Sequence, residues 1–173
     1  MNRPRTAALA LAALATAGCV SMDLFQVWRD PNYQPAPVHR VFVVALTPEP
    51  QDRPTFENAI AHAIQLRGFE VATAAANLAP GPVDDAKVAA YARDNHVDLV
   101  IVQHLTSLAV AQPDIAPADA SGETIVYKAM SYPKEPIWNG AMGAHNFVTF
   151  PEVAASLATS LVNHLLKAQI LVR

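Results

Sequence analysis

The sequence predicts an α/β fold: a single three-layer-like domain with a mixed five-stranded sheet and the element order β-α-β-α-β-β-β-α. Two unbroken apolar runs of strand length, Arg40 to Leu46 and Asp98 to His104, predict strands buried on both faces. Helical patterns alternate with strands in the first half, which is typical of parallel β-α-β units. Two successive strand patterns follow, and they predict an antiparallel hairpin.

The first half reads as two β-α-β units. We expect a helix at Asp52 to Arg67, a strand at Phe69 to Thr73 and a helix at Asp84 to Asn95. Asp52 is the expected N-cap of the first helix, and Gly68 stands just past its end. If the second and third strands flank the first, right-handed crossovers put the two helices on opposite faces of the sheet.

The second half opens with a loop, Ala109 to Gly122, rich in Pro, Ala and Asp. Strands are expected at Thr124 to Tyr132 and Ile137 to Ala144. The last helix begins with Thr149-x-x-Glu152, a capping box, with Val148 and Val153 as its hydrophobic staple.

The amino terminus reads as an export signal. A basic start is followed by Thr6 to Ala17, an apolar stretch of signal length that is too short for a membrane-spanning helix. The segment Leu14 to Cys19 then places small residues before the only cysteine of the chain. It resembles the lipobox of bacterial lipoproteins, although Thr16 stands where that family most often has Leu. The alternatives are a secretory signal cut near Ala17 that leaves a free exported thiol, or a buried structural cysteine.

The lipobox resemblance implies cleavage between Gly18 and Cys19 and a mature chain that begins with a lipidated cysteine. It implies a diacylglyceryl thioether and an amide-linked acyl chain, so membrane lipid anchors the protein through Cys19, more firmly than one chain would. Val20 stands where an aspartate usually retains lipoproteins at the inner membrane, which implies an outer-membrane address facing the periplasm. The predicted organisation is a signal peptide at 1–18, a lipid-anchored tether at 19–37 and an α/β domain at 38–173.

Composition excludes other classes of protein. The chain has 173 residues, of which 52% are hydrophobic and 16% charged, enough to fill one core. Its formal net charge is -3, and without residues 1–18, which hold two arginines and no acid, 10 basic and 15 acidic residues leave -5. We therefore expect no nucleic-acid partner, because nucleic-acid binding needs clustered Lys and Arg.

The segment Val20 to Arg40 lacks periodicity and contains several prolines, so we expect a tether that runs from the lipid to the fold. Trp28 and Tyr33 are aromatic residues of this segment. They are either contacts for a partner or a strap that packs onto the domain, because large rings bury the area that fixes irregular segments.

Several stretches resemble a family of small bacterial lipoproteins of unknown function: Trp28 to Tyr33, Arg40 to Leu46, Arg53 to Glu57 and the Gly68 stop. The junction Ala92-Arg93-x-x-x-Val97-Asp98-Leu99-Val100 is similar to the TolB amino-terminal domain type of fold. That fold is shared by the curli-secretion lipoprotein and by activator lipoproteins of penicillin-binding proteins. The resemblance implies fold and compartment better than function.

Catalytic patterns are missing from the sequence. Six histidines show no closely spaced pair of metal ligands, and no serine stands in a Gly-x-Ser-x-Gly elbow. We expect Gly140 to Gly143 to be part of a strand that contains small residues, and not a phosphate-binding loop. We therefore expect no enzyme, no metal and no cofactor, although a triad assembled from distant residues would be invisible here.

The leading hypothesis is a non-catalytic envelope adaptor or accessory factor that binds another envelope protein. We expect the contact in the loop Ala109 to Gly122, where Ile115 is the natural anchor, or at Trp28 and Tyr33. Simple disorder is the alternative for this loop. The alternative function is a periplasmic module that binds glycan or another small molecule, and an enzyme is the third reading.

Cys19→Ala should leave an unlipidated precursor that fails to partition with membrane lipids, because no other residue can form the thioether. Labelling cells with radioactive palmitate measures this directly. The wild-type chain should carry label and the variant should carry none; label on the variant would overturn the lipobox assignment.

Overall fold

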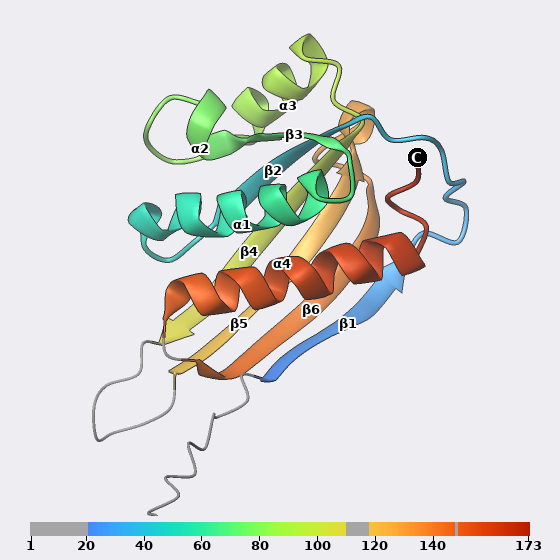
Figure 1. The fold of residues 1–173 in the computed structure, drawn as a ribbon. Helices are drawn as coiled ribbons and strands as arrows, with labels where there is room; N and C mark the ends of the chain where they lie inside the picture. The colour runs from blue at the N-terminus through green and yellow to red at the C-terminus, as the bar shows by residue number, and fades with distance from the viewer. Residues whose placement is uncertain (1–20, 110–117, 148) are drawn as a thin grey trace, which may run out of the picture.

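The two apolar runs form the parallel centre of the sheet. Strand β2 (Arg40–Leu46) pairs with β4 (Leu99–Ala109) from Val41↔Leu99 to Leu46↔His104. Strand β3 (Glu70–Thr73) pairs in parallel with the other edge of β2, so the second and third predicted strands flank the first, as expected. These contacts come from a computed structural model that describes residues 21–109, 118–147 and 149–173 (Figure 1).

The sheet has six strands in the order β1-β6-β5-β4-β2-β3. The antiparallel half holds β1, β6 and β5, and the helices connect or follow the strands (Figure 1). The remaining elements are β1 (Ser21–Arg29), η1 (Pro50–Asp52), α1 (Arg53–Gln65), α2 (Ala74–Asn77), α3 (Asp85–Asp94), β5 (Ala118–Lys128), η2 (Ala129–Ser131), β6 (Pro136–Phe147) and α4 (Phe150–Lys167).

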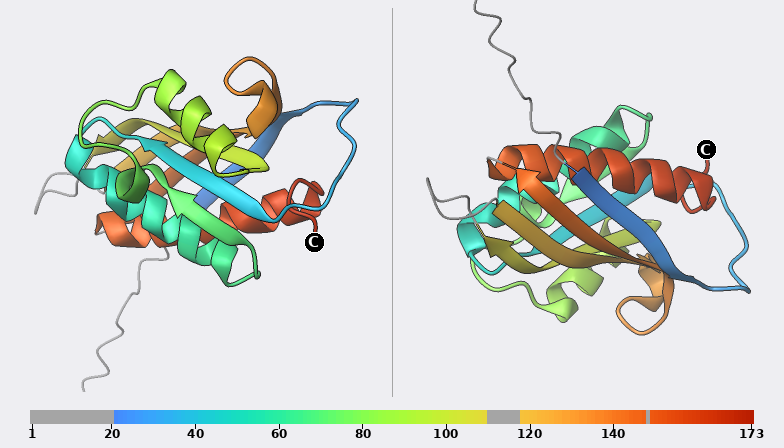
Figure 2. Two further views of the ribbon diagram at one scale, coloured as in Figure 1. Left: turned by 90° about the horizontal axis from the view of Figure 1, so that it is seen from above. Right: turned by 90° about the horizontal axis from the view of Figure 1, so that it is seen from below.

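Two apolar clusters sandwich the sheet. The larger lies under α1 and α4 and includes Val41, Val43, Phe56 and Leu157. The smaller lies between the sheet and α3, where Phe42 of β2 stacks on Tyr91 with ring centroids 4.4 Å apart. Residues of β2 thus alternate between the clusters, because side chains of a strand point to alternate faces. The views in Figure 2 show α1 and α4 on one side and α2 and α3 on the other, which confirms the predicted placement of the first two helices.

The prediction of five strands is wrong by one. Residues Ser21–Arg29, expected within the tether, form β1 at the edge of the sheet, antiparallel to β6. The pairing shifts register between Gln26 and Trp28, which leaves Val27 in a bulge. A bulge breaks the strict alternation by which a strand is found in sequence, and an edge strand with three exposed apolar residues shows no buried stripe.

The hairpin of β4 and β5 is longer than predicted. The expected loop Ala109 to Gly122 is partly strand. Ala109 is the last residue of β4 and pairs with Asp119, and residues 118–122 belong to β5. The inward residues of this stretch, Ala120 and Gly122, are small, so the sequence has no alternation of large apolar and polar residues that would predict a strand there. Ile115 lies outside the described residues.

Helix ends follow the predicted chemistry in part. Asp84 caps α3 by accepting a hydrogen bond from the Ala86 N–H at 2.8 Å, and Gly68 takes a positive φ of 84° after α1. Asp52 precedes α1 but makes no side-chain cap, because it lies in η1 with helical backbone angles. Thr149 and Glu152 form the capping box of α4, in which the Glu152 carboxylate accepts from the Thr149 N–H at 3.0 Å. Val148 of the predicted staple lies outside the described residues.

Thr149→Ala should lower the free energy of unfolding by about 1 kcal/mol, because the helix loses its capping hydroxyl. Denaturant titration measures the change. Thr159→Ala is the matched control: this hydroxyl donates to the Ala155 carbonyl within the same helix at 2.9 Å, and alanine is the better helix former. Equal midpoints for the two variants would show that the box does not hold the helix start.

Candidate functional site

One surface of the antiparallel half is left uncovered. Within the described residues, α2 and α3 lie beside the parallel strands, and no helix lies over β1 and β6 on that side of the sheet (Figure 2). Three large apolar side chains of β1 are exposed: Phe25 by 57%, Val27 by 62% and Trp28 by 43%.

The strand register arranges this surface in two rows. Phe25, Ala141 and Glu123 are paired across β1, β6 and β5, and Trp28, Asn139 and Ile125 form the next row. Paired residues of neighbouring strands project to the same side of a sheet, so the six side chains share one surface. We call these six residues the open face.

The open face is apolar toward β1 and polar toward β4. Glu123 accepts a hydrogen bond from Asn139 Nδ2 at 3.4 Å, and its carboxylate lies 3.8 Å from His104 Nδ1. Further along the same strands, His145 Nδ1 lies 2.9 Å from the Asp119 carboxylate. Both histidine pairs are solvent-exposed, so they organise the surface and add little stability.

The edge beside the open face is poorly protected against association. Natural edge strands carry charges, prolines or bulges that block pairing with another chain. The run from Leu24 to Trp28 has the bulge at Val27 but contains no charged residue and no proline. A contiguous exposed apolar patch of this kind marks an interaction site.

The predicted contact residues separate into two groups. Trp28 lies on the open face, but Tyr33 is only 5% exposed and packs between Arg29 and Lys128, whose charged groups lie 5.4 and 5.2 Å from its ring centroid. Burial raises the pKa of the Tyr33 hydroxyl, and the Arg29 charge opposes this shift. Tyr33 is therefore a strap residue, with no surface left for a partner. Gly18 and Cys19 lie outside the described residues.

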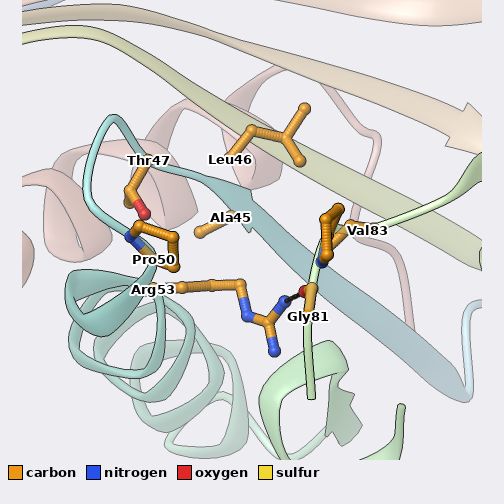
Figure 3. A pocket seen from close by; sticks show the side chains of 8 residues that line it. Ala45, Leu46, Thr47, Pro50, Arg53, Gly81 and Val83 are labelled. Carbon is orange, nitrogen blue, oxygen red and sulfur yellow. Dashed lines mark hydrogen bonds between the residues drawn. The ribbon is translucent and has the colours of Figure 1, made fainter. Parts of the chain in front are cut away.

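A crevice lies at the carboxyl end of β2 (Figure 3). Its volume is about 360 Å³, and it is walled by the end of β2, the start of α1 and residues 81–83. The chain leaves β2 toward α1 on one face and leaves β3 toward α3 on the other. Open α/β sheets bind ligands at such switch points, so the chemistry of this crevice has to be judged from its side chains.

Two charged side chains of α1, Glu57 and Arg53, connect the elements around the crevice. Glu57 of α1 is fully buried and accepts hydrogen bonds from the N–H groups of Ala45 at 3.0 Å and Ala75 at 2.5 Å. Arg53 Nε lies 3.6 Å from Glu57 Oε1, and Arg53 Nη1 donates to the Gly81 carbonyl at 3.2 Å (Figure 3). Burial raises the pKa of Glu57, while the two hydrogen bonds and Arg53 lower it. Glu57 therefore holds the fold together at this crevice, while the buried Nε of Arg53 makes no hydrogen bond among the described residues.

The sequence analysis does not find Glu57, nor the exposed Phe25 and Val27 of β1. A signal for Glu57 exists, since it precedes Ile60, Ala61 and Ile64 by three, four and seven positions and so lies on the apolar face of the helix. For the histidines the prediction of no metal site stays a prediction. Among the described residues, no group of three His, Cys, Asp or Glu side chains could hold an ion.

The fold has relatives among solved structures. The dodecamer of PelC from Paraburkholderia phytofirmans matches 84% of this chain and 97% of its own, with a TM-score of 0.60 and 13% identity. A variant PelC dodecamer matches with a TM-score of 0.61 and 14% identity, over 84% of this chain and 98% of the other. Such identities show a shared fold alone.

Two further solved structures resemble this chain more weakly. Lipoprotein GNA1162 from Neisseria meningitidis gives a TM-score of 0.48 and 13% identity over 75% of this chain and 99% of that one. TolB from Acinetobacter baumannii gives 0.42 and 8% identity over 84% of this chain and 31% of TolB. No known family model and no curated protein matches the sequence. The likeness to curli-secretion and penicillin-binding-protein activator lipoproteins stays a prediction.

Glu57→Ala should lower the free energy of unfolding by about 3 to 5 kcal/mol, because it leaves two backbone donors and Arg53 without their acceptor. Glu70→Ala is the control: Glu70 pairs with Arg40 at 2.7 Å on the surface, so its loss should cost less than about 1 kcal/mol. Urea titration measures both. If both variants lose a similar amount of unfolding free energy, the buried contacts of Glu57 do not stabilise the fold more than a surface ion pair does.

The same titration repeated across pH measures how the protonation of Glu57 contributes to the free energy of unfolding. Because burial raises the pKa of Glu57, the folded protein holds this proton more tightly than the unfolded chain. The stability that this gives is present below about pH 4.3 and is lost as the pH rises through the raised pKa. Glu57→Gln should lack that part of the pH slope.

Proposed function

We propose that this protein is a lipid-anchored envelope protein that acts as a non-catalytic adaptor through protein-protein contact, and that the open face with the β1 edge makes the contact. The observation that carries the proposal is the group of exposed apolar side chains, Phe25, Val27 and Trp28, in a stretch of the edge strand β1 without charged residues. The contact predicted in the loop Ala109 to Gly122, with Ile115 as its anchor, stays a prediction.

Anchoring brings this surface close to the membrane. Strand β1 begins at Ser21, two residues after Cys19, and two residues span about 7 Å at most. Lipidation of Cys19 would therefore hold the edge strand beside the bilayer instead of on a long tether. In the part of the chain that the structure describes, no helix is both long and apolar enough to cross a membrane. An acyl anchor would supply the attachment.

A second copy of this chain is the first partner to test. PelC, which shares the fold at low identity, forms a dodecamer. A neighbouring copy could cover Phe25 and Trp28 and pair with the free edge of β1, and both changes bury surface that is costly to leave in water. Another envelope protein could use the same edge by adding a strand to it.

Glycan binding is the second candidate function. Phe25 and Trp28 present aromatic rings beside Asn139 and Glu123, whose side chains can donate and accept hydrogen bonds. Rings that bind an apolar sugar face next to a few polar groups are a frequent arrangement of ligand sites. Retention of the protein on cell-wall or capsular glycan, lost with Trp28→Ser, would favour this candidate.

The double variant Phe25→Ser, Trp28→Ser should abolish specific association while leaving the melting temperature within a few degrees, since both side chains are exposed. Sedimentation of the mature chain measures self-association, and a photo-crosslinking residue at position 27 captures other envelope proteins. Leu66→Ser is the matched control, because Leu66 is 72% exposed at the end of α1, away from the open face.

Two results would separate the partners. A wild-type oligomer that the double variant lacks identifies a second copy, whereas a monomer with a discrete crosslinked band identifies another protein. A monomer without crosslinks, or crosslinks unchanged in the double variant, would overturn the adaptor proposal.

A further inference from the structure

A second cavity lies away from the open face and the crevice, between the carboxyl-terminal half of α3 and the turn η2. Its volume is about 600 Å³, within the range of small-molecule sites. We call it the α3 groove. The space exists because alanines line it where larger residues would fill it: Ala89 and Ala92 on the helix and Ala129 on the turn.

The walls of the α3 groove are fixed. Tyr132 lines one side, and its hydroxyl donates to the Asp85 carboxylate, which holds the ring against the start of α3. The ring also packs edge-on against Tyr127, with centroids 5.1 Å apart. Ala92 and Val97 are buried at the floor. A rigid apolar cleft of this kind needs little reorganisation to accept a ligand.

Met130 forms the outer lip. Its side chain is 98% exposed, although methionine is usually buried. Methionine is flexible and polarisable, and it recurs at surfaces that accept apolar ligands of variable shape. Folding Met130 over a bound apolar group would remove both from water.

One end of the groove carries the guanidinium of Arg93 beside the imidazole of His96. Arg93 and His96 line it, and among the described residues neither side chain makes a hydrogen bond or ion pair. Asp85, which accepts the hydrogen bond from the Tyr132 hydroxyl, does not line the groove. His96 follows the end of α3 with a φ of 52°, the left-handed conformation in which helices commonly end.

We propose that the α3 groove binds an amphiphilic anion, with an alkyl chain along the alanines and an anionic head at Arg93 and His96. The carboxylate of a fatty acid and the phosphate of a single-chain lipid share this chemistry. The proposal is independent of the adaptor function, because it uses other residues on another part of the surface.

Isothermal titration of the mature chain tests the groove with four probes below their micelle-forming concentrations. Dodecanoate and dodecyl phosphate supply chain and charge, dodecanol supplies the chain alone, and acetate supplies the charge alone. Both dodecyl anions should bind at one site and more tightly than dodecanol, and acetate should not bind. The tighter of the two anions indicates whether a fatty acid or a phospholipid is the source.

Variants assign the two parts of the site. Arg93→Gln should weaken dodecanoate about tenfold and leave dodecanol unchanged, since a charge-assisted hydrogen bond is lost. Lys87→Gln, an exposed cation of α3 that does not line the groove, is the matched control and should change neither. Ala89→Leu should abolish both by filling the groove, with a thermal melt showing that the chain still folds.

Three results would overturn the proposal. The first is dodecanoate binding no tighter than acetate. The second is an equal effect of Arg93→Gln and Lys87→Gln on dodecanoate. The third is a folded Ala89→Leu chain that binds both dodecyl probes as the wild type does.

Discussion

Glu57 joins three elements through one buried carboxylate: it accepts from the end of β2 and from the start of α2, and it lies beside Arg53 at the start of α1. Taking a carboxylate out of water is costly, and the two donors and the guanidinium offset that cost only in this geometry. The ends of β2 and β3 are thereby held where the chain departs to opposite faces. The position of α1 against the sheet, and so of the core beneath it, depends on this contact.

The helix layers explain where the open surface lies. Helices α1 and α4 cover one side of the sheet, while α3 and the short α2 cover only the parallel half of the other side (Figure 2). Strands β1, β6 and β5 therefore expose one surface, on which Phe25 and Trp28 stand beside Glu123 and Asn139. The shared fold with PelC fixes the scaffold, but at 13% identity it does not fix this surface, because function resides in the side chains that a scaffold carries.

Local patterns were enough for the central elements. Strands β2 and β4 were found from continuous apolar runs, α3 from its helical pattern and α4 from its capping box, because each of these signals depends on residues that are close together in the sequence. Crossover handedness, which is a property of the L-amino-acid chain, then predicted the first two helices on opposite faces of the sheet. Strand β1 was not found, because its exposed apolar residues and its bulge give no periodic stripe.

The sequence by itself determined the α/β class, the parallel centre and the expectation of a lipidated Cys19, since each rests on residue types at short spacing. Only the tertiary structure decided that Glu57 is buried, that Tyr33 is a strap while Trp28 is exposed, and that alanines of α3 leave a groove beside Arg93. Whether a side chain is covered depends on which distant element lies over it. No local pattern records that, among the described residues, β1 is covered by a helix on one side of the sheet only, or that the short turn η2 lies beside α3.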